Sequence, residues 1–477
     1  MSTNADARSL HADASEPPGA VVPGAVAPGA VVPLDPLPVG LPASEGAAPA
    51  GRGRWRRALG GRFALTAADQ CVSSFSNFAV GVAIARVAGI DALGAYSLAY
   101  VVWLLLADFH RSLVTDPMAI ENDLTGTRMR RAVQVGLAAE IVLGLAMAGV
   151  AAGAGGLLLL CGQHAYGTAF VGLSPWLPFL LVQDYWRWVA FMRARPGHAL
   201  ANDLVFDVVQ GLAFGVLFVV GTHSSALAIG AWGVGALAGA LFGLRQHHVR
   251  PALSGGVARM RERWPMSRWL LGGSVTTWGA SQAYIVITAA LLGPAGIGGL
   301  RAALSLVSGP SLVLLQAGGS VGLPESSKAL ERRGWPGLRR VERAITAASV
   351  VSVAAVGVVV LLWGGQLLAL LYGPQFRQFG STADLLALSV LLSTLSVGAV
   401  LSLKAVKLTD MVFRKSVASL VVSVIAVVVM VPMFGVQGAA GAAIARCAVV
   451  SAATLALHWR FSRHAAEGLQ PGLAAAG

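Results

Sequence analysis

Long apolar stretches separated by short polar connections constrain the fold of this chain more than any other feature. A stretch of about 20 apolar residues is long enough to cross the hydrocarbon core of a bilayer as a helix. Only 12% of the residues are charged, whereas soluble domains carry about 25%. The sequence therefore predicts an all-α polytopic membrane protein. We expect twelve transmembrane helices, near residues 63–87, 92–116, 132–156, 168–190, 199–220, 225–245, 268–292, 297–323, 342–363, 382–403, 414–433 and 437–458.

Two similar stretches, Ala88–Pro117 and Ala295–Pro324, indicate an internal repeat. Both begin Ala-Gly-Ile-x-x-Leu-x-Ala and end on a proline, so a constant offset of 207 residues relates them. An Arg-rich segment follows each stretch. Repeats at half the length of a chain are typical of transporters built from two related lobes. Because six helices per half is an even number, the two predicted six-helix lobes share one orientation and form a pseudo-symmetric parallel repeat.

The domain boundaries are predicted from composition. Residues 1–57 are expected to be a disordered cytosolic tail rich in Pro, Ala and Gly, because proline recurs too often in Pro18–Pro33 for a helix to form. The expected domains after it are a six-helix N-terminal lobe at 58–250, a cytosolic linker at 251–267, a six-helix C-terminal lobe at 268–463 and a cytosolic tail at 464–477.

The distribution of basic residues predicts how the chain is oriented. The net charge is +13, and most of the 35 Lys and Arg residues lie in the N-terminal tail and in alternate loops. The opposite side holds only Arg86, Arg301 and Arg377. By the positive-inside rule, both termini and the loop at 325–343 are expected in the cytosol, and the turn at 372–377 outside. No nucleic-acid-binding motif accompanies the basic clusters, so no nucleic acid partner is expected.

Nothing in the sequence predicts catalytic or metal chemistry. Cys71, Cys161 and Cys447 form no CxxC pair and lie in or beside apolar segments, which is typical of small buried hydrophobic residues. No HExxH, GxSxG, Walker or Rossmann signature occurs in a suitable context. The predicted outer loops are also too short to hold a soluble catalytic domain. We therefore expect a protein that is not an enzyme and that binds no cofactor or metal.

Four segments resemble a known transporter family. The stretch Asp69–Arg86 has the pattern DQxxxSxxNFxxxxxIAR, and residues 184–210 contain an Arg-rich turn followed by Asp-x-x-Gln. The third segment is Leu371-Tyr372-Gly373, and the fourth, at 432–440, has the pattern PxxGxxGAA. In order and spacing, these segments resemble the polysaccharide (O-antigen, Wzx-type) flippases of the multidrug/oligosaccharidyl-lipid/polysaccharide exporter superfamily. The long Pro-rich tail and the Ala/Gly-rich helices depart from that pattern.

The resemblance implies a MATE-like fold and a function. The implied protein is a secondary transporter of the bacterial cytoplasmic (inner) membrane that flips a lipid-diphosphate-linked oligosaccharide for cell-surface polysaccharide synthesis. Its implied partners are the lipid-linked glycan, membrane lipids, a coupling proton or sodium ion, and glycan-assembly proteins. A cation-coupled multidrug exporter of the same superfamily is an open alternative. A polytopic glycan polymerase is a further one, although the short outer loops argue against it.

Acidic residues inside predicted spans are the first candidates for a mechanism. Each lies seven to nine residues from the nearest cytosolic end, which places all of them roughly 10–14 Å deep. They either brace helices through ion pairs, or at least one couples transport to a proton or sodium gradient. With only Arg111 and Arg187 nearby, not all can be ionised cheaply, so at least one is expected to bind a proton. These ion-coupling candidates are Asp69, Asp108, Glu140, Asp184 and Asp207.

Arg446 is the main candidate for binding a substrate. It lies near the middle of the last predicted span, with no acid of its own half nearby. Desolvating an unpaired guanidinium costs several kcal/mol, so Arg446 should face water, an acid across the cavity or an anionic ligand. Its planar fork suits a diphosphate, while pairing with a helix carbonyl or a first-half acid is equally open. Further candidates are Arg111, Asn77 and Gln282; for both amides, hydrogen bonding between helices is the alternative.

Overall fold

The computed structural model describes residues 52–120, 126–193, 195–221, 224–252, 255–405 and 409–466. Within these ranges the side chains of 52–71, 312–324, 327, 404–405, 409–416, 461 and 464–466 are not described. The described elements are all helical. They are α1 (Arg52–His110), η1 (Arg111–Thr115), α2 (Asp116–Ile120), α3 (Gly126–Leu160), α4 (His164–Leu173), η2 (Ser174–Trp176), α5 (Leu177–Met192), α6 (Pro196–Val220), α7 (Ser225–His247), α8 (Gly256–Tyr372), η3 (Pro374–Phe379), α9 (Gly380–Thr394), α10 (Val397–Ala405) and α11 (Thr409–Ala466).

The three longest helices are each interrupted by glycine. Gly89 breaks α1 with φ 86°, Gly293 and Gly334 break α8 with φ 69° and 59°, and Gly435 breaks α11 with φ 58°. A residue with a β-carbon rarely adopts such positive φ values, whereas glycine does so at no steric cost. All four breaks fall in connections that the sequence predicts between spans.

Nine stretches of the described chain are long and apolar enough to cross a membrane. Four of them contain one of the glycine breaks, at Gly89, Gly293, Gly334 or Gly435. Once these breaks are counted, the described helices divide into segments that correspond to the twelve predicted spans. The expected all-α polytopic fold is therefore confirmed. Two helix ends differ from expectation, since α8 begins at Gly256, inside the predicted linker, and extends to Tyr372.

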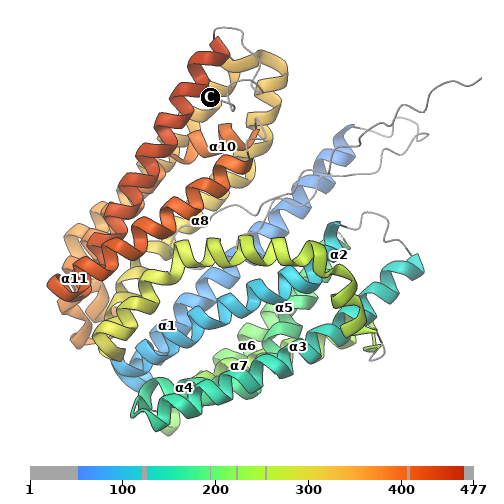
Figure 1. The fold of residues 1–477 in the computed structure, drawn as a ribbon, viewed down its shortest axis with the longest axis vertical. Helices are drawn as coiled ribbons and strands as arrows, with labels where there is room; N and C mark the ends of the chain where they lie inside the picture. Colours follow the sequence, from blue (N-terminus) through green and yellow to red (C-terminus); the bar gives the residue numbers. More distant parts are fainter. Residues whose placement is uncertain are drawn as a thin grey trace, which may run out of the picture.

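The helices form two bundles that meet at one end, which we call the shared end (Figure 1). The N-lobe contains α1 to α7, and the C-lobe contains α8 to α11. The first part of α8 runs along the N-lobe, where Gly256 lies against the backbone of Ala139 on α3. Away from the shared end the two bundles diverge, and each finishes in a free tip (Figure 1). The glycine turns at Gly89 and Gly293 lie at the shared end, where a β-carbon on Gly94 would overlap the carbonyl oxygen of Pro294. The lobes are thus in direct backbone contact there.

This contact corrects the register of the internal repeat. A β-carbon on Gly298 would overlap the carbonyl oxygen of Ile90, which mirrors the contact of Gly94 with Pro294. The offset that relates Gly89 to Gly293, Ile90 to Pro294 and Gly94 to Gly298 is 204 residues, not 207. A shift of three residues is nearly one helical turn, so the apolar face is almost unchanged by it. The positive-φ glycines Gly89 and Gly293 therefore set the register of the repeat. Aligning the two Ala-Gly-Ile sequences instead shifts it by three residues.

Polar contacts also join the lobes near the shared end. The guanidinium of Arg86 on α1 donates to the carbonyl oxygens of Leu370 and Leu371 at the end of α8, the latter at 2.7 Å. The hydroxyl of Tyr166 on α4 donates to the carbonyl of Ala289 on α8 at 3.0 Å. Arg86 therefore has a partner in the other lobe, besides any contact with the membrane interface.

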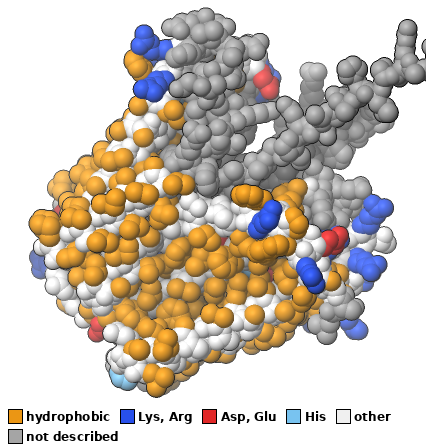
Figure 2. All heavy atoms as spheres, in the orientation of Figure 1, with side chains coloured by type: hydrophobic (Ala, Val, Ile, Leu, Met, Phe, Trp, Pro, Cys, Tyr) orange, Lys and Arg blue, Asp and Glu red, His pale blue; other side chains and the backbone are white. Residues whose placement is uncertain are grey.

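Hydrophobic side chains cover most of the molecular face in Figure 2. Lys and Arg side chains gather at the free tips of both lobes, and few lie near the shared end (Figure 2). An apolar belt with basic tips is the surface expected of a membrane protein whose tips lie on one side of the bilayer.

Candidate functional site

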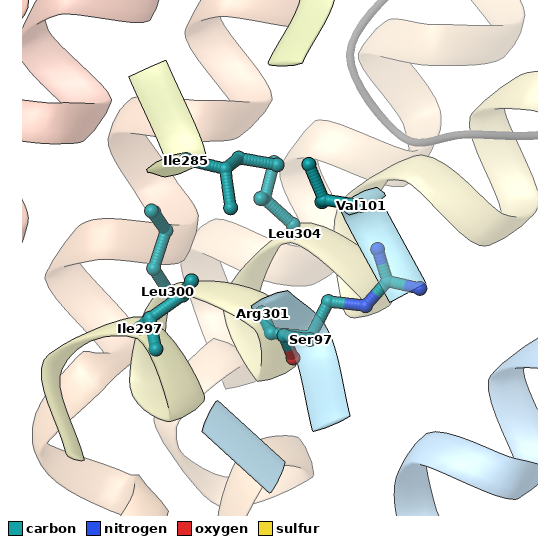
Figure 3. Close-up of a pocket in the computed structure, with 7 residues that line it drawn as sticks. All are labelled: Ser97, Val101, Ile285, Ile297, Leu300, Arg301 and Leu304. Atoms are coloured by element: carbon teal, nitrogen blue, oxygen red, sulfur yellow. The ribbon is translucent and has the colours of Figure 1, made fainter. Parts of the chain in front are cut away.

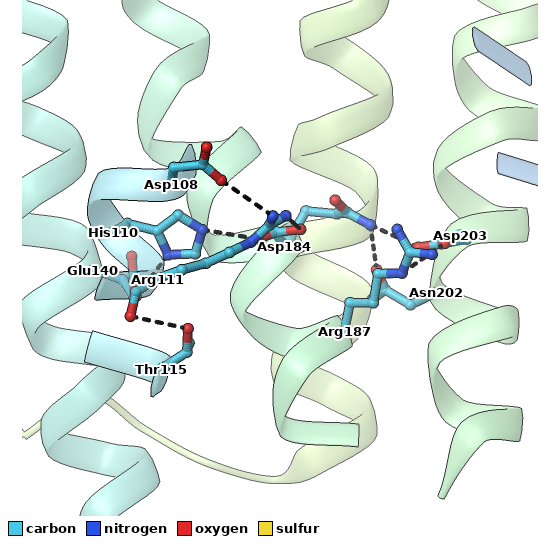
Figure 4. A network of polar contacts seen from close by, with 10 residues as sticks. Asp108, His110, Arg111, Thr115, Glu140, Asp184, Arg187, Asn202 and Asp203 are labelled. Carbon is cyan, nitrogen blue, oxygen red and sulfur yellow. Dashed lines mark hydrogen bonds and ion pairs between the residues drawn. The ribbon is translucent and has the colours of Figure 1, made fainter. Parts of the chain in front are cut away.

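A cluster of buried charges lies inside the N-lobe, between α1, α3 and α5 (Figure 4). Arg111 forms a two-point pair with Asp184, in which Nε donates to Oδ2 at 3.0 Å and Nη2 donates to Oδ1 at 2.9 Å. Asp108, which is more exposed, lies 3.7 Å from Nη1 of Arg111. The ring of His110 contacts Asp184 with Nε2 at 2.8 Å and Glu140 with Nδ1 at 3.0 Å. Three of the predicted acids thus meet around two adjacent basic residues.

A π-helical turn makes this arrangement possible. Directly after His110, the chain forms η1, a π-helix of five residues. Consecutive residues of an α-helix point about 100° apart, yet both His110 and Arg111 reach the one carboxylate of Asp184. The wider π turn is the local feature that accompanies this convergence. Such bulges occur frequently at functional sites.

A second charged group braces α5 against α6. Arg187 pairs with Asp203 at 3.4 Å, and the amide of Gln183 donates to Asp203 at 2.9 Å and to Asn202 at 3.2 Å. Arg187 therefore has an acid partner that the sequence analysis did not single out.

The other two predicted acids lie apart from this cluster or cannot be placed. Asp207 on α6 accepts a hydrogen bond from Ser76 on α1, and Gln210 donates to the same hydroxyl at 3.0 Å. The side chain of Asp69 lies outside the described residues. The sequence predicts one layer of five acids. In the structure three of them form a cluster around His110 and Arg111, and a fourth, Asp207, takes part in a separate contact between α1 and α6.

The C-lobe contains a buried guanidinium without an acid partner. Arg446 on α11 is 7% exposed, and its Nη2 lies 3.6 Å from the sulfur of Cys447. Its Nε has no hydrogen-bond partner, and no carboxylate among the described residues pairs with it. The phenol of Tyr284 is buried, unpartnered and within electrostatic range of both Arg446 and Arg301. In the described part of the chain, no acid pairs with Arg446 or Arg301.

The two amide candidates lie on different lobes. Gln282 on α8 is buried, and its Oε1 has no partner among the described residues. Asn77 on α1 is half-buried.

The seam between the lobes is tightly closed beside Arg301 (Figure 3). The guanidinium of Arg301 lies 4.8 Å from the ring of Tyr100 on α1, a cation–π contact between the lobes. The adjacent pocket is too narrow to admit a water molecule. It is lined by Ser97, Val101, Ile285, Ile297, Leu300, Arg301 and Leu304.

Two central residues were missed from sequence. His110 is recognisable in the sequence as an ionisable residue within a predicted span, directly before Arg111. Asp203 lies four residues before Asp207, on the same face of one helix. Among the described residues, no group of His, Cys, Asp and Glu is arranged to hold a metal ion.

Comparisons with known proteins identify the fold. No family model matches the sequence, and no curated protein matches it. The structure is similar to an inward-facing multidrug resistance MATE family transporter of the MOP superfamily, with a TM-score of 0.67 and 13% identity over 81% of this chain and 94% of that one. The fold is that of the MATE transporters.

Other solved structures share this fold. The lipid II flippase MurJ in an inward closed conformation has a TM-score of 0.66 and 11% identity, over 82% of this chain and 87% of that one. A MOP superfamily transporter from Pyrococcus furiosus, described as having a binding pocket of reversed polarity, has a TM-score of 0.56 and 13% identity, over 84% of this chain and 94% of that one. The MATE-like fold is thus common to drug transporters and to a lipid flippase.

Proposed function

We propose that this protein is a secondary transporter that flips a lipid-diphosphate-linked oligosaccharide across the bacterial cytoplasmic membrane. The observation that carries the proposal is Arg446, a buried guanidinium with no acid partner among the described residues. Leaving such a group uncompensated is costly. A diphosphate supplies the missing charge and accepts two parallel hydrogen bonds from one guanidinium.

Two unpartnered polar groups on α8 suit the same ligand. Tyr284 offers an unpartnered hydroxyl within its electrostatic range, and Gln282 offers an unpartnered amide oxygen on the same helix as Tyr284. We assign Gln282 and Asn77 to the sugar-binding part of the site. Arg111 is less suited to this role because Asp184 already occupies its Nε and Nη2.

The arrangement of the lobes supports alternating access. They are in contact at the shared end and diverge towards their free tips (Figure 1). We place the basic free tips in the cytosol by the positive-inside rule, with both termini on that side. In this orientation the structure is an inward-facing state, ready to accept a substrate made in the cytosol.

A cation-coupled multidrug exporter is the second candidate. It is favoured by the similarity to a multidrug MATE transporter, 94% of whose chain is covered. A cationic drug needs an acid that is free to pair with it. In the N-lobe, Asp184 is already paired with Arg111, and Glu140 with His110.

A deletion strain separates these candidates. Loss of the gene should cause lipid-linked oligosaccharide to accumulate, and restoring the wild-type gene should clear it. Arg446→Ala should fail to clear it at normal membrane abundance, whereas Arg446→Lys should clear it in part because the charge remains. Arg463→Ala, an exposed arginine on the same helix, is the control. A deletion strain that becomes sensitive to cationic compounds but does not accumulate lipid-linked oligosaccharide would instead identify a drug exporter.

A further inference from the structure

We propose that His110 and Glu140 together form a proton-binding site of the N-lobe, and that η1 links this site to the seam between the lobes. The first argument is geometric. The imidazole of His110 is fully buried, and each ring nitrogen faces a carboxylate oxygen, at 3.0 Å and 2.8 Å. A neutral imidazole has a single N–H. With Glu140 and Asp184 both ionised, only an imidazolium satisfies both contacts.

The buried charges around His110 also require a bound proton. Asp184 is neutralised by its two-point pair with Arg111. Glu140 is 0% exposed, its Oε1 contacts only His110, and its Oε2 has no partner. A buried carboxylate without a counter-charge is strongly unfavourable. The pair therefore holds one proton, shared between Nδ1 of His110 and Oε1 of Glu140, for as long as both stay buried.

The surrounding groups leave this assignment intact. On the His110 side of the chain, Asp108 and Asp116 are within electrostatic range of Arg111. On α5, besides Asp184, the phenol of Tyr185 is within range of Glu140, and Arg193 and Arg263 are within range of Tyr185. The α8 residue in hydrogen-bond contact with η1 is the uncharged Ser274. Among the described residues, the basic groups within electrostatic range of Glu140 are His110 and Arg111.

The link to the other lobe is short. Ser112, the second residue of η1, is fully buried, and its hydroxyl lies 2.9 Å from the hydroxyl of Ser274 on α8. Only Arg111 separates it from His110 in the chain. When the proton leaves, the attraction that holds His110 to Glu140 weakens, and η1 is free to revert to an α-helical turn. That change rotates Ser112 away from Ser274 and loosens the contact between the lobes.

Nitrogen NMR of the full-length protein in lipid bilayers tests the proton site. With labelled histidine, the His110 signal is assigned by its loss in His110→Gln. We expect an imidazolium, or a neutral imidazole beside a protonated Glu140 carboxyl, at about pH 8, where an exposed histidine is neutral. In Glu140→Gln, His110 should be neutral at that pH. A neutral His110 at about pH 8 in the wild type, beside a Glu140 carboxyl that its own carbon signal shows to be ionised, would overturn the site.

The matched control is a second His–Glu pair in the C-lobe. Glu342 lies 3.0 Å from Nε2 of His458. Glu342→Gln should alter the His458 signal and leave His110 unchanged. If Glu140→Gln does not fold, the wild-type titration alone decides the outcome.

Disulfide cross-linking tests the link through η1. The pair Ser112→Cys and Ser274→Cys, in a cysteine-free background, should cross-link well at about pH 8, where the site keeps its proton, and several-fold less above the pH at which the NMR titration shows that proton to be lost. Thiol oxidation itself depends on pH, so yields are divided by those of Ser396→Cys with Ser451→Cys, whose hydroxyls lie 3.2 Å apart within the C-lobe. A ratio that does not change with pH would refute the link.

Only the role of this link in transport rests on the proposed function. Glu140→Gln should remove the dependence of oligosaccharide clearance on the proton gradient. If clearance is absent even with the wild-type protein, the proposed function fails while the NMR result stands. If clearance occurs but keeps its full gradient dependence in Glu140→Gln, the coupling role of this site fails alone.

Discussion

At the scale of single residues, two glycines set how closely the lobes approach each other. Gly94 faces the carbonyl of Pro294, and Gly298 faces the carbonyl of Ile90. Neither carbonyl can move without moving a whole helix, since each belongs to the first turn after a glycine break. Gly149 on α3 has open space beside it instead.

Gly94→Ala should therefore destabilise the protein. The added methyl group overlaps the backbone of the other lobe, and overpacking of this kind costs about 1–3 kcal/mol. Gly149→Ala, the control, should be neutral or stabilising by about 0.5–1 kcal/mol, because alanine is the better helix former. Thermal unfolding in detergent measures both. Equal melting temperatures for the two variants would show that the lobes do not depend on this contact.

At the scale of elements, the sequence predicts the helices well and their exact pairing poorly. Spans are set by hydropathy, and the breaks at Gly89, Gly293, Gly334 and Gly435 all fall where connections are predicted. The repeat was misaligned by three residues, since a shift of almost one turn preserves the apolar face. Register depends on backbone contacts between helices that are distant in sequence, which hydropathy does not encode.

The charged site was predictable only in part, for a related reason. Depth along a helix follows from counting residues, and on that basis Asp184, Glu140 and Asp108 were grouped near one level. In the structure these three acids contact His110 or Arg111. The ion-pair partners of these acids depend on which faces of the packed helices contact each other. They also depend on a π-helical turn that no sequence pattern predicts. His110 is therefore not among the predicted candidates, and Asp207 accepts a hydrogen bond from Ser76 on α1.

At the scale of the whole molecule, the separation of basic tips from the shared end predicts the orientation in the membrane. In a variant whose native cysteines, including Cys71, Cys161 and Cys447, are replaced, Gln375→Cys should react with an impermeant thiol reagent added outside intact cells. Arg333→Cys should react only after the cells are opened. Both side chains are exposed in the structure, so neither result is limited by burial. External labelling at position 333 would invert the topology.

We propose that the protein moves a lipid-diphosphate-linked oligosaccharide between leaflets. The most direct measurement uses purified protein in vesicles that carry this lipid in both leaflets, with an impermeant glycosidase added outside. In the presence of an ion gradient, we expect vesicles with wild-type protein to lose the sugars of both leaflets. Vesicles with Arg446→Ala should lose only those of the outer leaflet, as empty vesicles do. If vesicles with wild-type protein lose only the sugars of the outer leaflet, as empty vesicles do, the protein does not flip this lipid.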